Sequence, residues 1–269
     1  MNREQFRTMF DPERPMLIGV CHLLPLPGSP RSHEPMPAVI ERAVADARAY
    51  ADGGMAGVLV ENFGDAPFYP DDAPKETVAA MAVVAAEVRG SVSVPVGVNV
   101  LRNDASAALA VAAAARLAFV RINVHAGVLA TDQGLLQGRA HETLRLRART
   151  APEVRLFCDV LVKHAIPLAA TDIVRAAGET IGRALADALI VTGAATGSAA
   201  DLDEVRRLRA ALPGAPLLVG SGVASENVRS VLETADGAIV GTSLKRGGLT
   251  EAPVDPARVQ ALVAAARGR

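Results

Sequence analysis

The stretch from Leu217 to Ser230, "LLVGSGVASENVRS", joins a short apolar run to a helical pattern through Gly-Ser-Gly. A run of Leu and Val is typical of a buried strand, and Ser225 is a residue type that caps helices. The stretch therefore predicts a strand, a tight turn and a helix, the repeating unit of parallel α/β folds. Two explanations fit the small residues of the turn: they let the helix pack close to the sheet, or they present backbone N–H groups to an anion.

The same unit recurs along the chain. Short β-branched or Leu-rich runs begin at Met16, Gly57, Pro95, Ala118, Val154, Asp187, Pro216 and Gly237. Segments with helical period follow at 38–51, 75–88, 104–116, 139–149, 171–183, 201–212, 225–232 and 255–266, with Asn103 or Asp104, Thr171, Asp201 and Ser225 as predicted caps. This alternation predicts an α/β fold, a (β/α)8 TIM barrel of the phosphate-binding type. A doubly wound open sheet has the same pattern and stays the alternative, because strand order cannot be read from a sequence.

Length and composition fit one domain of this kind. The chain has 269 residues, of which 50% are hydrophobic and 3% aromatic. Its core must therefore consist of Ala, Val, Leu and Ile, as in parallel sheets covered by helices. We find no linker or low-complexity stretch, so we expect a single barrel domain over residues 1–269.

Charge and cysteine usage exclude several classes of protein. The net charge of −1 gives no basic excess, so we expect no nucleic-acid partner. No apolar run reaches the roughly 18 residues of a membrane span, and the charged N-terminus does not resemble a secretory signal, so we expect a cytoplasmic protein. Cys21 and Cys158 lack CxxC spacing and are interpreted as reduced core thiols. The Ala-rich helices suit packing between subunits, and we expect a homo-oligomer.

Polar residues stand at most of the predicted strand ends, where the core alone would favour Val or Leu. Buried polar groups are costly unless they are paired, so this convergence predicts a polar pocket at the barrel mouth. The residues predicted to bind substrate there are His22, Asn62, Asn99, Arg102, Arg121, Asn123 and Asp132. Asp132 belongs to "TDQG", a segment that we interpret as a lid over the pocket.

The candidates for catalysis are Glu61, Asp65, Asp159, Lys163 and His164. Glu61 and Asp65 are four residues apart and are interpreted as an acid–base pair or as oxygen ligands for Mg²⁺, and the metal requirement stays open. Asp159 is a candidate base, metal ligand or sugar ligand. Lys163 either neutralises a phosphate or, with a pKa lowered by burial, forms a Schiff base, and His164 transfers protons.

Glycine turns follow the last two predicted strands, the position at which barrels bind phosphate. The predicted phosphate-binding residues are Gly220, Ser221 and Gly222 after one strand and Gly241, Thr242 and Ser243 after the next, and the following "LKRGG" is a candidate short helix. Gly193 and Thr196, after the preceding strand, are additional donor candidates. The sequence contains no GxSxG elbow, no GxxxxGK[ST] loop and no zinc-ligand spacing, which excludes hydrolase triads, P-loop ATPases and zinc peptidases.

The segments at the strand ends resemble the BtpA family, also called the BtpA/SgcQ family. The resemblance covers nearly the whole chain and is carried by "HLLPLPGSP", "VENFGDAPF", "GVNVLRNDA", "RINVHAGVLATDQGLLQGRA", "DVLVKHA", "VTGAATG", "VGSGV" and "VGTSLK". It implies a phosphate-binding barrel related to the ribulose-phosphate-binding barrels. One branch of the family has a role in photosystem I biogenesis, and another is labelled a nucleoside triphosphatase. Ser32 and the stretch 125–127 depart from the family pattern, which bears on the ligand.

These observations lead us to expect an enzyme that acts by acid–base chemistry on a small phosphorylated metabolite, a sugar phosphate or a nucleotide-derived pentose phosphate. Isomerase, lyase and glycosyl-transfer reactions all fit. A non-catalytic assembly or stability factor is the alternative, and it predicts an exposed apolar patch in place of a polar pocket. A sensor that binds a phosphorylated metabolite without forming a product is a third possibility, because a barrel fold does not by itself imply catalysis.

Overall fold

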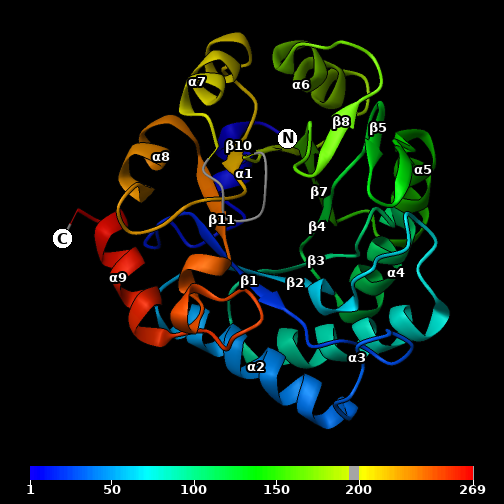
Figure 1. The fold of residues 1–269 in the computed structure, drawn as a ribbon. Helices are drawn as coiled ribbons and strands as arrows, with labels where there is room; N and C mark the ends of the chain where they lie inside the picture. The colour runs from blue at the N-terminus through cyan, green and yellow to red at the C-terminus, as the bar shows by residue number, and fades with distance from the viewer. Residues whose placement is uncertain (194–199, 269) are drawn as a thin grey trace.

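The computed structural model describes residues 1–193 and 200–268, and it shows a closed barrel of eight parallel strands surrounded by helices (Figure 1). The barrel strands are β1 (Leu17–His22), β2 (Gly57–Glu61), β3 (Val96–Asn99), β4 (Phe119–Ile122), β7 (Arg155–Val160), β9 (Ala188–Val191), β10 (Leu217–Val219) and β11 (Gly237–Val240). Pairing of β1 with β11 closes the cylinder. The barrel prediction is thereby confirmed, and the open sheet is excluded.

The helices follow the strands in the predicted alternation. They are α2 (Met36–Asp52), α3 (Lys75–Ser91), α4 (Ala105–Ala115), α5 (Ala140–Thr150), α6 (Ile173–Gly182), α7 (Leu202–Ala211), α8 (Val228–Thr234) and α9 (Pro256–Ala266). Figure 1 shows them as a ring outside the barrel. Within the described residues, no helix is long and apolar enough to cross a membrane.

Two of the predicted helix caps are confirmed and two are wrong. Asp104 and Asp201 accept backbone hydrogen bonds at the starts of α4 and α7. Helix α6 is capped by Asp172 rather than Thr171, because the Asp172 carboxylate accepts the N–H groups of the first turn. Helix α8 begins after Asn227 rather than near Ser225. The Asn227 side chain accepts the Ala224 N–H and donates to the Gly222 carbonyl, which extends the turn.

An N-terminal helix that the sequence did not predict fills the amino end of the barrel. Helix α1 (Arg3–Arg7) starts with a capping box formed by Asn2 and Gln5. Its Phe6 is fully buried and, with Phe10, packs among side chains that point into the barrel. The centroid of the Phe6 ring lies 5.6 Å from that of Phe157. Four of the few aromatic residues of the chain thus fill the amino end of the barrel, and we call this cluster the plug: Phe6, Phe10, Phe119 and Phe157.

A small antiparallel sheet also departs from the sequence analysis. Strands β5 (Val128–Thr131) and β6 (Gly134–Gln137) form a hairpin in the loop after β4, and β8 (Ala165–Pro167), from the loop after β7, pairs with β5. The segment interpreted as a lid, "TDQG", is the turn of this hairpin. Short 3-10 helices also occur in the loops: η1 (Phe63–Asp65) after β2, and η2 (Thr242–Leu244) and η3 (Arg246–Gly248) after β11.

Candidate functional site

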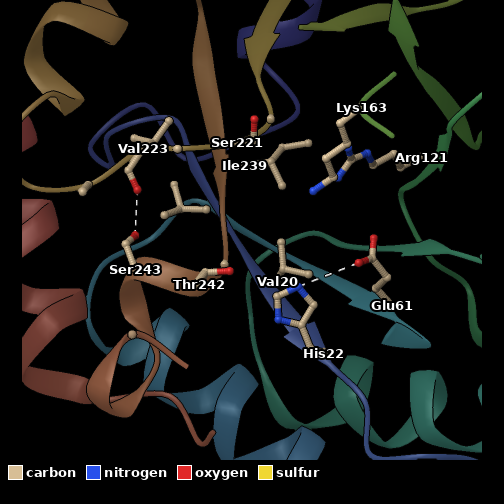
Figure 2. Close-up of a pocket in the computed structure, with 16 residues that line it drawn as sticks. Val20, His22, Glu61, Arg121, Lys163, Ser221, Val223, Ile239, Thr242 and Ser243 are labelled. Atoms are coloured by element: carbon tan, nitrogen blue, oxygen red, sulfur yellow. Dashed lines mark hydrogen bonds and ion pairs between the residues drawn. The ribbon is translucent and has the colours of Figure 1, made fainter. Parts of the chain in front are cut away.

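The carboxyl ends of the barrel strands surround a cavity of about 180 Å³. One wall consists of the turns after β10 and β11, and the other carries polar side chains from β1, β2, β4 and the segment after β7 (Figure 2). Those side chains are His22, Glu61, Arg121 and Lys163. Residues from the first and the last strands of the barrel therefore meet at one end of it.

The two predicted phosphate turns lie side by side in this cavity. The Ser243 hydroxyl donates to the Val223 carbonyl at 2.6 Å and so ties one turn to the other (Figure 2). Ser221 accepts the Gly193 N–H at 2.6 Å, and the hydroxyls of Thr242 and Thr250 lie 3.0 Å apart. Because the Ser243 proton is already engaged, its hydroxyl holds the turns together instead of donating to a ligand. Thr196, the remaining predicted donor, lies outside the described residues.

The backbone of the turns leaves donors available. Within residues 1–193 and 200–268, the N–H groups of Gly222, Val223, Thr242 and Ser243 donate to no protein acceptor. Consecutive free N–H groups in a turn form a concave site that favours an anion. Arg121 and Lys163 add positive charge across the cavity.

Close packing and backbone conformation account for three glycines of these turns. A Cβ at Gly241 would lie 2.6 Å from Cε1 of His22, and one at Gly220 would lie 2.5 Å from Cγ2 of Ile190, so close packing requires glycine at both positions. Gly222 has a φ of +66°, a conformation that disfavours other residues. Packing explains two of the glycines, and the shape of the turn explains the third.

Asp159 is fully engaged with its neighbours. Arg121 donates two hydrogen bonds to its carboxylate, at 3.0 and 3.1 Å, and Asn123 donates a third at 2.6 Å. The Asp159 side chain has no exposed surface, and it does not line the cavity of Figure 2. The geometry thus makes Asp159 the group that orients Arg121, since both carboxylate oxygens accept hydrogen bonds from protein side chains.

Glu61 lines the cavity. Asn99 donates to its Oε2 at 2.7 Å, and Nε2 of His22 lies 3.8 Å from its Oε1 (Figure 2). Burial lowers the pKa of His22 well below its usual value, and the charges of Lys245 and Lys163 lower it further. The imidazole beside Glu61 is therefore neutral near pH 7, which leaves the Glu61 carboxylate without a cation from this side.

The structure does not bring Asp65 to Glu61. Helix η1 turns the Asp65 carboxylate back toward the loop after β1, where it accepts the Leu26 N–H at 2.7 Å and the Asn62 side-chain amide at 3.0 Å. Asn62 in turn accepts the Leu101 N–H at 2.8 Å, so both side chains brace neighbouring loops. They line a small cavity that Glu61 does not reach. Burial raises the pKa of Asp65.

This placement contradicts the acid–base or Mg²⁺ pair that four-residue spacing predicted, because helix η1 turns Asp65 toward Leu26 and Asn62. Asp65 and Asn62 act on loop structure instead of lining the cavity of Figure 2. In the part of the chain that the structure describes, no group of three or more His, Cys, Asp or Glu residues is placed to hold a metal ion.

A second cavity of about 390 Å³ continues from the first, because Glu61, Arg121 and Lys163 line both. Its other walls come from the segments after β2, β3, β4 and β7 and from the hairpin turn: Phe63, Phe68, Leu101, Arg102, Asn123, Asp132, Gln133 and His164. The predicted substrate residues Arg102, Asn123 and Asp132 are therefore brought together here. Phe63 and Phe68 were not predicted, although both lie in "ENFGDAPF", because a sequence does not show which face of a loop is turned inward.

Lys163 stands where the two cavities meet. Its backbone N–H donates to Oγ1 of Thr192 at 3.0 Å, and its carbonyl accepts a bond from Arg102 at 2.8 Å. Burial lowers the pKa of Lys163, and the adjacent Arg121 charge lowers it further. The next residue, His164, has a φ of +59°, a strained backbone conformation of the kind that concentrates at functional sites. Partial burial lowers the pKa of His164.

Comparison with solved structures supports the fold. The chain is similar to phosphoribosyl anthranilate isomerase from Thermus thermophilus, with a TM-score of 0.56 and 14% identity over 94% of this chain and 99% of that one. It is also similar to N-(5'-phosphoribosyl)anthranilate isomerase from Pyrococcus furiosus, with a TM-score of 0.55 and 13% identity over 94% and 100% of the two chains. At these identities the likeness shows the barrel fold and nothing about the reaction.

Sequence relatives give the family. The chain is 46% identical over 249 residues to "Photosystem I biogenesis protein BtpA" of Synechocystis, covering 93% of this chain and 87% of that protein. It is 46% identical to an uncharacterised protein of Thermococcus kodakarensis over 96% and 97% of the two chains, and 31% identical to one of Caenorhabditis elegans over 93% and 92%. The BtpA family model matches residues 13–268. The chain therefore belongs to the BtpA family.

Proposed function

We propose that the protein is an enzyme acting on a small phosphorylated metabolite at the carboxyl end of the barrel. The observation that carries this proposal is the meeting of the two turns, after β10 and β11, in one cavity with Arg121 and Lys163. The turns bind the phosphate through backbone N–H groups, and the cations neutralise its charge. The rest of the substrate extends past Glu61 into the second cavity.

Glu61 is the acid–base group of the proposed reaction. Its carboxylate lines both cavities, so it lies beside a substrate that spans them. Asn99 fixes its orientation through Oε2, which leaves Oε1 toward the substrate and the neutral His22. Proton transfer to and from a carbon or oxygen next to a carbonyl is the chemistry of isomerases and lyases, and such a group contributes about 10²- to 10⁴-fold to the rate.

The first test is binding. Inorganic phosphate should raise the melting temperature of the protein, whereas potassium chloride of equal ionic strength should not, because only phosphate matches the turns. At a concentration of about 100 Kd the ligand adds roughly 2.7 kcal/mol to the free energy of unfolding. Absence of stabilisation by phosphate and by every member of a panel of sugar phosphates would remove the proposal.

The second test is turnover. The sugar phosphate that stabilises the protein most is incubated with it, and the carbon-bound protons are followed by NMR in D₂O. We expect exchange or product formation, and we expect Glu61→Gln to slow it about 10²- to 10⁴-fold while phosphate still stabilises the variant. Tight binding without exchange or product would indicate a sensor of the metabolite instead.

A protein-binding role is the second candidate, and one surface favours it. In the small sheet, Leu135 and Ile166 are the register partners of Ala130 on its two sides, so the three share a face. Leu135 is 63% and Ile166 73% exposed, and Leu168, two residues farther, is 60% exposed. Exposed apolar residues of this kind mark interaction surfaces. The Synechocystis relative named for photosystem I biogenesis is consistent with such a role.

One double variant distinguishes an enzyme from a protein-binding factor. Leu135→Ser combined with Ile166→Ser should leave phosphate stabilisation and turnover unchanged if the protein is an enzyme, because neither residue lines the two cavities. If the protein acts by binding a partner, the same change should abolish its biological effect in cells. The double variant also tests self-association by gel filtration.

A further inference from the structure

The chain contains three lysines and 25 arginines, and the three lysines have different environments. Lys75 is exposed at the start of α3. Lys245 is fully buried, and its ammonium group donates to Oδ2 of Asp46 at 2.9 Å. Lys163 lines the two cavities of the candidate site. Since arginine supplies almost all of the positive charge of this protein, lysine at 163 calls for a reason other than charge.

The side chain of Lys163 is unengaged. Among the residues that the structure describes, its Nζ takes part in no hydrogen bond or ion pair, and Figure 2 shows the side chain extending into the cavity next to Arg121. The Asp159 carboxylate is hydrogen-bonded to Arg121, so it does not pair with Lys163. Bonds to Thr192 and from Arg102 fix the backbone on both sides of Lys163.

These surroundings make the Lys163 ammonium group lose its proton more readily than an exposed lysine does. Partial burial removes water from the Lys163 ammonium group, and the neighbouring guanidinium groups of Arg121 and Arg102 repel it, so its pKa is lowered. The carboxylates of Glu61 and Asp159 act in the opposite direction and do not cancel the effect. A lysine that loses its proton is a nucleophile toward carbonyl carbon, whereas an arginine at the same place stays charged.

We propose that Lys163 forms a Schiff base with the carbonyl carbon of a phosphorylated aldehyde or ketone whose phosphate lies on the turns after β10 and β11. This inference rests on the proposed function and specifies its substrate class. The Nζ lone pair forms a bond to the carbonyl carbon while the C=O π pair moves to oxygen, which takes up a proton and gives a carbinolamine. The C–O bond then breaks, oxygen leaves as water with a second proton, and a C=N bond forms.

Glu61 lies at the same junction of the cavities and is the group that supplies and removes these protons. The Glu61 carboxylate passes one proton from the amine to the oxygen and relays the second from solvent, so the iminium forms with uptake of one proton and loss of one water, without oxidation or reduction. The resulting iminium withdraws electrons from the adjacent carbon, which is how amine catalysis assists proton abstraction or carbon–carbon cleavage.

The test is reductive trapping on the wild-type protein. Dihydroxyacetone phosphate, ribulose 5-phosphate and ribose 5-phosphate are each added with sodium borohydride, which reduces the iminium to a stable secondary amine. Peptide mass mapping then locates the label among Lys75, Lys163, Lys245 and the N-terminus. We expect at least one of the three probes to label Lys163 ~10-fold or more over Lys75, because bound phosphate holds the carbonyl beside Nζ.

Controls separate this inference from the proposed function. Dihydroxyacetone, which lacks phosphate, should label Lys163 no more than Lys75, and excess inorganic phosphate should suppress labelling of Lys163. Lys163→Arg should abolish the label, whereas Lys75→Arg should leave it unchanged. If phosphate stabilises the protein but no probe labels Lys163, the Schiff base is wrong and the phosphate site stands. If phosphate neither stabilises the protein nor suppresses labelling, the proposed function itself fails.

Discussion

At the scale of single residues, Asp159 lies at the predicted strand end, but its contacts fit a structural role instead of the predicted role of base or ligand. The sequence placed it at a strand end beside other polar groups, and it does lie there. Its carboxylate, however, takes three hydrogen bonds from Arg121 and Asn123, and its side chain has no exposed surface. Loss of one partner of such a buried pair leaves an uncompensated charge, whose burial is costly.

We therefore expect Asp159→Asn to lower the free energy of unfolding by about 3 to 5 kcal/mol, measured by urea unfolding. Asp203→Asn is the matched control, since Asp203 pairs with Arg206 on the surface and its loss should cost only about 0 to 1 kcal/mol. Equal effects of the two substitutions would contradict a structural role for Asp159. Because the change acts on stability, it does not discriminate an enzyme from an assembly factor.

Two histidines make stability depend on pH. Burial is the main cause that lowers the pKa of both His22 and His125 from the ordinary value of 6.5. The unfolded chain takes up a proton near pH 6.5 and the folded chain does not, so unfolding becomes more favourable as the pH falls below that value. Each histidine should then lower the free energy of unfolding by up to about 1.4 kcal/mol per pH unit.

This dependence is measured by urea unfolding between about pH 5 and pH 8, where the contribution of these histidines should level off above pH 7.5. His125 donates from Nε2 to the Ala184 carbonyl at 2.9 Å when neutral, a bond that glutamine can replace, so His125→Gln should flatten the slope. His141 is exposed on α5, and His141→Gln should leave the slope unchanged. An unaltered slope in His125→Gln would show that this residue is protonated in the folded protein.

At the scale of elements, the barrel strands and their helices could be predicted because each carries its own signal. A parallel strand that is covered on both faces is a short apolar run, and its helix has a 3.6-residue period. The sheet of β5, β6 and β8 could not, because β8 has three residues and pairs with β5 from another loop. Asp65 was misplaced for a related reason, since the short helix η1 turns its side chain away from the cavity.

Two glycines in the turns after β10 and β11 have nearly the same backbone conformation and give a matched pair of variants. Gly222 has a φ of +66° and lines the cavity, whereas Gly247 has a φ of +64° and does not. Alanine should cost roughly 1 to 2 kcal/mol of stability at either position, because the left-handed conformation disfavours a Cβ. Only Gly222→Ala should also weaken phosphate binding, about tenfold for each 1.4 kcal/mol of binding free energy lost.

Phosphate affinity is measured by calorimetry on both variants under identical conditions. Gly247→Ala controls for the loss of stability, since its Cβ would meet only Leu249 at 3.9 Å. Equal affinity of the two variants, with equal stability, would show that the turn after β10 does not hold the phosphate.

At the scale of the whole molecule, the two ends of the barrel differ in the side chains that fill them. The carboxyl end carries the cavities and the strained backbone at His164, whereas α1 closes the amino end with apolar side chains. Arg3 of α1 bonds Asp236, directly before β11, at 2.6 Å, which fixes the helix to that end. This division follows the general rule that function lies at the carboxyl ends of barrel strands and stability at the amino ends.

The division predicts opposite effects of two phenylalanine substitutions. Phe6→Ala empties a fully buried position of the plug and should lower the free energy of unfolding by about 3 to 5 kcal/mol, with ligand affinity unchanged. Phe68→Ala removes part of the wall of the second cavity and should cost less stability, because Phe68 is only partly buried, while it weakens binding of the sugar phosphate. Urea unfolding and calorimetry on both variants provide the comparison. Both affinities are measured at a temperature where the two variants are folded. If Phe6→Ala lowered ligand affinity as much as Phe68→Ala, packing at the amino end would affect binding at the carboxyl end, and the two ends would not be independent.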